Sequence, residues 1–358
     1  MARRLLIGST TLAAAAALVL ATPGAASAHS HSHGPTVTVL NSTVGAPFQL
    51  AYRHGLVVAD GATSTVSRVN GPVLAHGPTP GEVAGVAFAP DGAMAYTSLD
   101  YTNGNATLTI TRQGKAPVVA DLSGFEASHN PDQNVTYGVD NPSQCVQDAF
   151  EPLGGATSQG GVDSHAYSVT SWLFGSWIVA DAGGNDLLKV DRWGHVSLLK
   201  VLPRQPLVVT ADIAAGLGLP DCVVGVTYNF EPVPTDVEVG PWGHLYVSLL
   251  PGGPEGPQLG ARGSVYTVNP FTRSTHRVAT GFLGATNVAV DHRGTVYVAE
   301  LFGGQISTIQ HGKVKPYVQL PGALAVELAG DKLFASTLGP TDEEGNPTGP
   351  GSVVRINR

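Results

Sequence analysis

One pattern of apolar and polar positions recurs along the chain: an apolar strand, a turn that contains glycine, and a second strand that ends in small residues. The clearest copy covers residues 286–299 (TNVAVDHRGTVYVA), and similar copies cover residues 235–248 and 84–97. Weaker copies begin near residues 48, 167 and 323, so the pattern occurs six times. A third strand usually follows each copy. Such a period indicates a fold that is built from repeated units.

The strands that this pattern predicts are buried on both faces. Side chains alternate between the two faces of a strand, and here both sets are largely apolar or small. Turns such as Asp91-Gly92 make neighbouring strands antiparallel. Sheets of about four short antiparallel strands, each packed between copies of itself, are propeller blades. The sequence therefore predicts an all-β, six-bladed β-propeller with four-stranded antiparallel blades, in which residues 37–40 add the outer strand that closes the last blade.

Two insertions interrupt the repeat, at about residues 112–161 and 202–231. Neither shows the strand–turn–strand pattern, so both are predicted to hold loops and short helices and not a seventh blade. In the first, residues 123–126 (SGFE) form a capping-box pattern for a helix that Asn130-Pro131 would end. The second has a possible helical turn near residues 210–215.

The first 28 residues have the three parts of a secretory signal peptide. Two arginines at positions 3 and 4 precede an apolar stretch over residues 5–20, and Ala26-Ser27-Ala28 offers the small residues of a cleavage site. The apolar stretch is too short for a membrane span. We therefore expect export, with a leader and closing strand over residues 29–45, the propeller over residues 46–358 and no membrane span after processing. A retained N-terminal anchor is the alternative.

Composition and charge narrow the class of protein further. The 45 glycines, 26 prolines and 13% charged residues fit many short strands joined by tight turns. The net charge of −8 makes nucleic acid and anionic lipid unsuitable partners. In an oxidising compartment the two cysteines, Cys145 and Cys222, are expected to form one disulfide between the insertions. Two free buried thiols are the alternative.

The candidate ligand-binding side chains lie where the innermost strands open onto the central channel. The aligned repeats place the following residues at one equivalent position: Gln49, Gly85, Ser168, Asp236, Asn287 and Ala323. The candidate residues for a metal or ligand at the channel mouth are Asp163, His165, Asp236, Asn287 and Glu300, with Glu238 nearby. Carboxylate and amide oxygens suit calcium, which can polarise a carbonyl group. Alternatively, these side chains cap turns through hydrogen bonds to the backbone.

A second candidate metal site lies in the leader, where His29, His31 and His33 alternate with serines. After cleavage behind Ala28, the free amine, two amide nitrogens and the imidazole of His31 could bind copper(II) or nickel(II) in a plane. The alternative is a polar spacer without a metal. Three other histidines, His195, His244 and His292, are expected to be solvated turn residues.

Three segments resemble the ScyD/ScyE family of exported propeller proteins, which are related in pattern to NHL-repeat proteins. They are residues 121–132 (DLSGFEASHNPD), 179–191 (VADAGGNDLLKVD) and 234–247 (PTDVEVGPWGHLYV). The resemblance covers roughly residues 47–357. Members of this family in cyanobacteria accompany synthesis of the pigment scytonemin. The resemblance implies a propeller fold and export, and it implies no established activity or catalytic residues.

No catalytic motif accompanies this scaffold. The sequence has no Gly-x-Ser-x-Gly elbow, and Gly183-Gly184 is expected to be a hairpin turn because no helix pattern follows it. We therefore predict a non-enzymatic, monomeric, secreted propeller whose loops bind a small molecule or a secreted protein. The alternative is a calcium-dependent hydrolase of the lactonase type that uses Asp236, Asn287 and Glu300.

Overall fold

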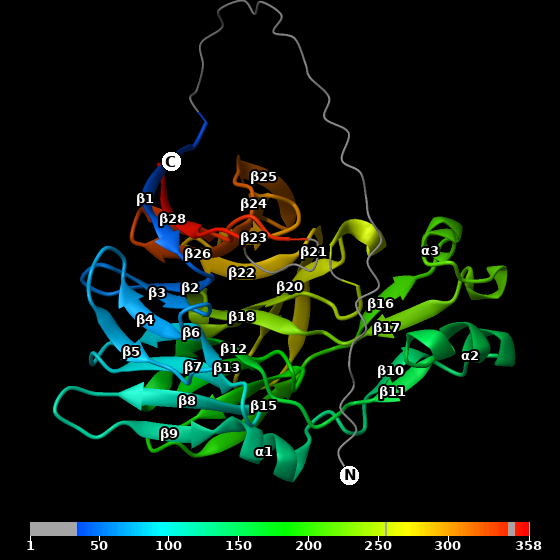
Figure 1. Ribbon diagram of the computed structural model, residues 1–358, viewed down its shortest axis with the longest axis horizontal. Helices are drawn as coiled ribbons and strands as arrows, with labels where there is room; N and C mark the ends of the chain where they lie inside the picture. Colours follow the sequence, from blue (N-terminus) through cyan, green and yellow to red (C-terminus); the bar gives the residue numbers. More distant parts are fainter. Residues whose placement is uncertain (1–33, 255, 343–347, 358) are drawn as a thin grey trace, which may run out of the picture.

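The computed structural model describes residues 34–254, 256–342 and 348–357, which form seven four-stranded antiparallel sheets (Figure 1). We number six of them in chain order. Sheet 1 holds β2 (Pro47–Tyr52), β3 (Leu56–Asp60), β4 (Thr65–Arg68) and β5 (Val73–His76). Sheet 2 holds β6 (Gly81–Phe88), β7 (Met94–Asp100), β8 (Asn105–Thr111) and β9 (Val118–Asp121). Sheet 3 holds β12 (Ala166–Ser171), β13 (Trp177–Asp181), β14 (Asp186–Val190) and β15 (Val196–Val201).

The second half of the chain repeats this order. Sheet 4 holds β18 (Pro234–Val239), β19 (Leu245–Leu249), β20 (Gly263–Val268) and β21 (Thr275–Phe282). Sheet 5 holds β22 (Ala285–Val290), β23 (Val296–Glu300), β24 (Gln305–Gln310) and β25 (Lys313–Gln319). Sheet 6 holds β26 (Ala323–Ala329), β27 (Lys332–Thr337), β28 (Gly351–Asn357) and, as its outer strand, β1 (Thr36–Val44).

The first strands of these six sheets surround a common centre. Each of β2, β6, β12, β18, β22 and β26 packs against the next, and β26 packs against β2, so the series closes on itself. Hydrogen bonds also close the ring, because β1 from the start of the described chain pairs with β28 from its end, with Val39 opposite Val354. The ring is therefore held by strand pairing as well as by packing.

Apolar side chains on both faces of each sheet fill the space between neighbouring sheets. Between sheets 2 and 3, Leu108 and Ile110 belong to the same buried cluster as Trp177, Val179 and Leu188. Similar clusters separate the other neighbours. This burial on both faces explains the near-continuous apolar runs in the sequence. No helix within the described residues is long and apolar enough to cross a membrane.

The two insertions form the seventh sheet, so the prediction that they hold only loops and short helices is wrong. Its strands, in spatial order, are β11 (Thr157–Gln159), β10 (Thr136–Val139), β17 (Thr227–Phe230) and β16 (Gln205–Val208). Each has only three or four residues, and all three residues of β11 are exposed, so no alternating pattern marks them. Figure 1 shows this sheet, with its helices, to one side of the ring.

Short helices flank the strands of the insertions. The helix α1 (Leu122–His129) ends at Asn130, as predicted, but its N-cap is Asp121, whose side chain accepts from Gly124 N. The helix α3 (Ala211–Gly216) follows the N-cap Thr210 and occupies the predicted turn. The helix α2 (Gln144–Phe150) and the single turns η1 (Glu151–Leu153) and η3 (Asp221–Val223) complete this region. Three further turns lie elsewhere: η2 (Leu173–Gly175), η4 (Pro241–Gly243) and η5 (Pro257–Leu259).

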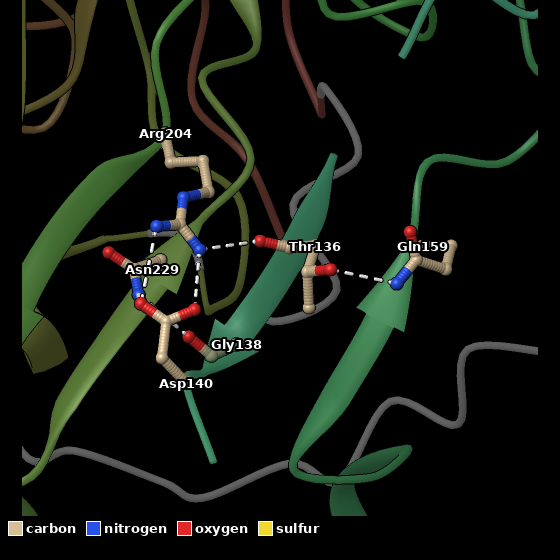
Figure 2. A network of polar contacts seen from close by, with 6 residues as sticks. All are labelled: Thr136, Gly138, Asp140, Gln159, Arg204 and Asn229. Atoms are coloured by element: carbon tan, nitrogen blue, oxygen red, sulfur yellow. Dashed lines mark hydrogen bonds and ion pairs between the residues drawn. The ribbon is translucent and has the colours of Figure 1, made fainter. Parts of the chain in front are cut away.

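A disulfide and a polar network join the two insertions. The prediction that Cys145 and Cys222 are paired is confirmed, and their Cα atoms lie 6.4 Å apart. Figure 2 shows Arg204 reaching the other insertion, where it donates to Thr136 O at 2.7 Å and to Asp140 Oδ1 at 2.8 Å. The amide of Asn229 donates to Gly138 O at 3.0 Å. The seventh sheet is therefore one unit, although its halves come from separate parts of the chain.

Candidate functional site

The aligned polar residues do occupy equivalent places at the centre of the ring. Gln49, Ser168, Asp236 and Asn287 each follow a β-bulge near the start of the first strand of their sheet. In sheet 6 the bulge lies between Ala323 and Ala325, so the equivalent residue is Ala325 and the alignment on Ala323 is wrong by two positions. All four polar side chains are buried.

These side chains hydrogen-bond from one sheet to the next. Gln49 Oε1 accepts from Val86 N at 2.8 Å, and Asn287 Oδ1 accepts from Val326 N at 2.8 Å. Asp236 Oδ2 accepts from Val288 N at 2.9 Å, while its Oδ1 receives the Ser168 hydroxyl and the Gln49 amide. These contacts join neighbouring sheets through backbone and side-chain groups, so they are not the local turn caps that the alternative expected. We call these four residues the central latches.

Two more carboxylates line the channel beside Asp236. Glu238 and Glu327 stand two positions beyond the latch place in their own strands, and Glu327 Oε1 accepts from Tyr52 N at 3.1 Å. Burial raises the pKa of Asp236 to about 6 and that of Glu327 to about 8, and burial together with the charge of Asp236 raises the pKa of Glu238 well above its usual range. Glu327 was missed by sequence reasoning, although its offset from the repeat matches that of Glu238.

These raised pKa values predict that the protein loses stability as the pH rises. A carboxyl group whose pKa is higher in the folded than in the unfolded protein stabilises the fold fully below its unfolded pKa, roughly 4. That contribution is lost as the pH passes the folded values of about 6 for Asp236 and about 8 for Glu327. The melting temperature, measured between pH 5 and 9 in a chelating buffer, should therefore fall. Glu327→Gln should flatten the upper part of the curve, and a melting temperature that rises over this range would contradict the prediction.

An ion pair lies at the end of the ring where the first strands begin. An imidazole nitrogen of His165 hydrogen-bonds Glu82 Oε1, and the Tyr101 hydroxyl donates to Glu82 Oε2 at 2.8 Å. Burial disfavours both charges, but the mutual attraction outweighs it, so the pKa of Glu82 is lowered and that of His165 is raised. The His165 side chain is 37% exposed, so part of its imidazole ring is open to solvent. Glu82 and Tyr101 were not anticipated from the sequence.

Glu300 has a repeated structural position at the same end. Like Asp60 in sheet 1 and Asp181 in sheet 3, Glu300 is the last residue of the second strand of its sheet. Each of these carboxylates lies opposite the first residue of the first strand of the same sheet. Glu300 Oε2 accepts from Leu283 N at 2.8 Å, and its Oε1 receives Gln305 Nε2 at 2.9 Å and the Ser307 hydroxyl. In the same way Asp60 Oδ1 accepts from Ala46 N at 2.8 Å. Each of these three carboxylates therefore holds the backbone just before the first strand of its own sheet.

The predicted site residues therefore lie in separate settings. Asp236 and Asn287 are buried latches, Glu300 anchors a turn, His165 faces solvent at the same end, and Asp163 is an exposed residue of the loop before β12. Among the residues that the structure describes, no three His, Cys, Asp or Glu side chains stand in an arrangement that could hold a metal ion. His29, His31 and His33 lie outside the described residues, as does the predicted signal peptide.

The opposite end of the ring carries a hollow of about 620 Å³, which sequence reasoning missed. Its aromatic lining residues are Trp172, Phe174, Trp242 and Phe271. Phe174, Trp242 and Phe271 are 93%, 89% and 72% exposed. Asp91 and Ser171 add polar groups to the lining. We call this feature the aromatic hollow.

Two of these aromatic residues have an unusual backbone. Phe174 has φ 58° and Trp242 has φ 62°, in the left-handed region that favours glycine. They occupy equivalent turns, between the first two strands of sheets 3 and 4, and each precedes a glycine. A non-glycine residue in this conformation costs about 1 kcal/mol. Two neighbouring sheets therefore each hold an exposed aromatic side chain on a backbone of unfavourable conformation. Exposed apolar side chains that lie together in this way indicate a binding surface.

Comparisons with solved structures find β-propeller-like proteins. A protein of unknown function from Bacteroides thetaiotaomicron is 10% identical, over 90% of this chain and 76% of that chain, with a TM-score of 0.50. A gluconolactonase from Xanthomonas campestris is 12% identical, over 90% and 89%, with a TM-score of 0.49. Virginiamycin B lyase from Staphylococcus aureus is 12% identical, over 84% and 80%, with a TM-score of 0.48. Likeness at these identities concerns the fold alone.

Comparisons at the level of sequence add no relative. No protein-family description matches the chain, and no curated protein does.

Proposed function

We propose that this protein is a secreted six-bladed propeller of the ScyD/ScyE type that binds a small organic ligand in the aromatic hollow. The six first strands that close into a ring support the blade count, with the seventh sheet as an accessory to one side. The disulfide suits an oxidising compartment outside the cytoplasm. The three segments that resemble the ScyD/ScyE family support the assignment to that type.

The observation that carries the binding function is the exposure of Phe174 and Trp242 beside a hollow of ligand size. Sites for small molecules are typically about 300–1,000 Å³, largely apolar, and contain few polar groups. The aromatic hollow has this size and lining. Flat aromatic side chains on two neighbouring turns suit a ligand with a flat apolar face, since stacked rings gain about 0.5–1.5 kcal/mol beyond their burial.

A fluorescent probe tests this proposal. Anilinonaphthalene sulfonate, which has flat apolar rings, should bind the purified protein with quenching of tryptophan emission. Trp242→Ala should weaken binding about tenfold, equivalent to about 1.4 kcal/mol. Trp193→Ala is the matched control, because Trp193 is also exposed but lies outside the hollow. Equal affinity in both variants would show that the aromatic hollow is not the binding site.

The alternative function is a calcium-dependent hydrolase that works at the channel mouth with Asp236, Asn287 and Glu300. This function is supported by the partly exposed imidazole of His165, which Glu82 holds by a hydrogen bond. A positioned histidine is the commonest general acid or base. Lactone hydrolysis that depends on calcium and is lost in His165→Ala would favour this function over ligand binding alone.

A further inference from the structure

Four buried carboxylates lie together between α1, the seventh sheet and sheet 3. They are Glu126, Asp132, Asp181 and Asp186, and none is more than 1% exposed. Within the part of the chain that the structure describes, none of the four forms an ion pair with lysine, arginine or histidine. Burying several like charges without a cation is strongly unfavourable. Something else must therefore neutralise them in the folded protein.

The hydrogen bonds divide these four carboxylates into two kinds. Asp181 is satisfied, since it accepts from the Ser164 hydroxyl, His165 N and Gly184 N. By contrast, both carboxylate oxygens of Asp186 are buried without a hydrogen-bond partner in the described structure. The same holds for Glu126 Oε1 and Asp132 Oδ1, and for the amide oxygen of neighbouring Asn130. Native proteins leave few buried polar atoms unpaired, so each such atom calls for an explanation.

These groups are near enough to act on one another. A Cβ atom placed on Gly184 would lie 3.4 Å from Glu126 Oε2 and 3.5 Å from Asp181 Cγ. Asn185, next to Asp186, donates to Asp132 Oδ2 at 3.1 Å. Burial raises the pKa of Asp186 well above its usual range, and the charges of Asp181, Glu126 and Asp132 raise it further. The carboxylates thus form one electrostatic unit.

The chain packs closely against Asp132. A Cβ atom on Gly160 would come within 2.0 Å of Asp132 Oδ1, so a side chain at Gly160 would displace that oxygen. The Tyr137 hydroxyl occupies only the other oxygen, Asp132 Oδ2, at 2.8 Å. Asp132 is therefore held through Oδ2, while the buried Oδ1 has no hydrogen-bond partner.

We propose that Glu126, Asp132 and Asp186, with the amide oxygen of Asn130, bind one calcium ion. Protons alone would remove the charge, but each proton can join only two of the unpaired oxygens. A cation satisfies several oxygens at once. The ligands are all oxygens, which selects a hard cation. Calcium tolerates irregular coordination, whereas magnesium demands near-ideal octahedral geometry.

Binding requires a small rearrangement, because no three acidic side chains among the described residues already surround one point in metal-binding geometry. The ion would join three separate parts of the chain: the end of α1, the loop before β10, and the start of β14. It would thereby fix the first insertion to sheet 3. This role is independent of ligand binding in the aromatic hollow, which lies at the opposite end of the ring.

Calcium binding to the purified protein tests the proposal. After treatment with a chelator and its removal, calorimetric titration with calcium chloride should give a stoichiometry of about one. Saturating calcium should raise the melting temperature by about 4 °C. Asp186→Asn should weaken calcium binding at least tenfold while its metal-free form melts no lower than the wild type, since an unpaired charge has been removed.

The matched control is Asp60→Asn, which changes a buried carboxylate whose two oxygens already accept from Gly45 N and Ala46 N. It should bind calcium as the wild type does. Absence of calcium binding by the wild type would overturn the proposal and leave protonation as the way in which the cluster is neutralised. Calcium binding that persists unchanged in both Asp186→Asn and Glu126→Gln would also overturn it, because the ion would then lie elsewhere.

Discussion

Replacing Asp236 by alanine should lower the free energy of unfolding by about 2–4 kcal/mol, because it leaves several buried donors without an acceptor. Asp236 is fully buried and receives Val288 N, the Ser168 hydroxyl and the Gln49 amide. It thereby connects sheet 4 with sheets 1, 3 and 5 through a single carboxylate. Urea denaturation, followed by tryptophan fluorescence, measures the loss.

The conservative variant separates this role from mere packing. Asp236→Asn keeps the size of the side chain and one oxygen for Val288 N, so it should lose less than half as much stability. It also removes the group whose pKa burial raises to about 6, so its stability should fall less steeply than that of the wild type as the pH rises through that value. If Asp236→Ala is as stable as the wild type, the central latches do not hold the ring together.

Much of this ring was predictable from the sequence, because the repeat itself carries the information. The glycine turns and the apolar runs at a common spacing located the first two strands of all six ring sheets. The alignment of the repeats correctly placed four polar residues at equivalent positions, namely Gln49, Ser168, Asp236 and Asn287. It failed in sheet 6 because small residues occupy both Ala323 and Ala325, so the apolar pattern does not reveal which of them follows the bulge.

The seventh sheet could not be predicted in the same way. Its strands are too short to show a period, and the pairing that joins its two halves sets Gly138 opposite Asn229, about 90 residues away along the chain. Partner choice over that separation depends on tertiary contacts, here the Arg204–Asp140 pair and the disulfide. The cysteines were the one local signal that the two insertions meet.

The candidate sites were hidden for different reasons. Phe174-Gly175 and Trp242-Gly243 occupy the same turn of successive repeats, so the aromatic hollow left a sequence signal that an alignment of turns, and not of strands, would have revealed. The buried carboxylates gave a weaker signal. Acidic residues next to glycine and asparagine, as in residues 181–186, are usual in solvated turns, and only the fold reveals that Asp186 is buried without a partner.

Removing the disulfide should release the seventh sheet and leave the ring intact. The bond spans 77 residues, for which the chain-entropy model gives a stabilisation of about 4 kcal/mol. Apart from the disulfide, the sheet is held by the Arg204–Asp140 pair and by one apolar cluster around Val139, Val146 and Val223. Its strands are only three or four residues long. The double variant Cys145→Ser, Cys222→Ser should therefore show fast amide exchange over residues 136–159 and 205–230.

Amides of the six ring sheets should keep their protection in this variant, because none of their strands pairs with a strand of the seventh sheet. Hydrogen exchange read by mass spectrometry distinguishes the two regions, and the wild type treated with a reductant should reproduce the pattern. Uniform loss of protection over the whole chain would contradict the prediction, since it would mean that ring and seventh sheet unfold as one cooperative unit. Loss of protection confined to residues 136–159 and 205–230 would instead show that the seventh sheet is a separately stabilised element. The hydrogen bond from Asn185 to Asp132 would then be one of the contacts that attach it to sheet 3.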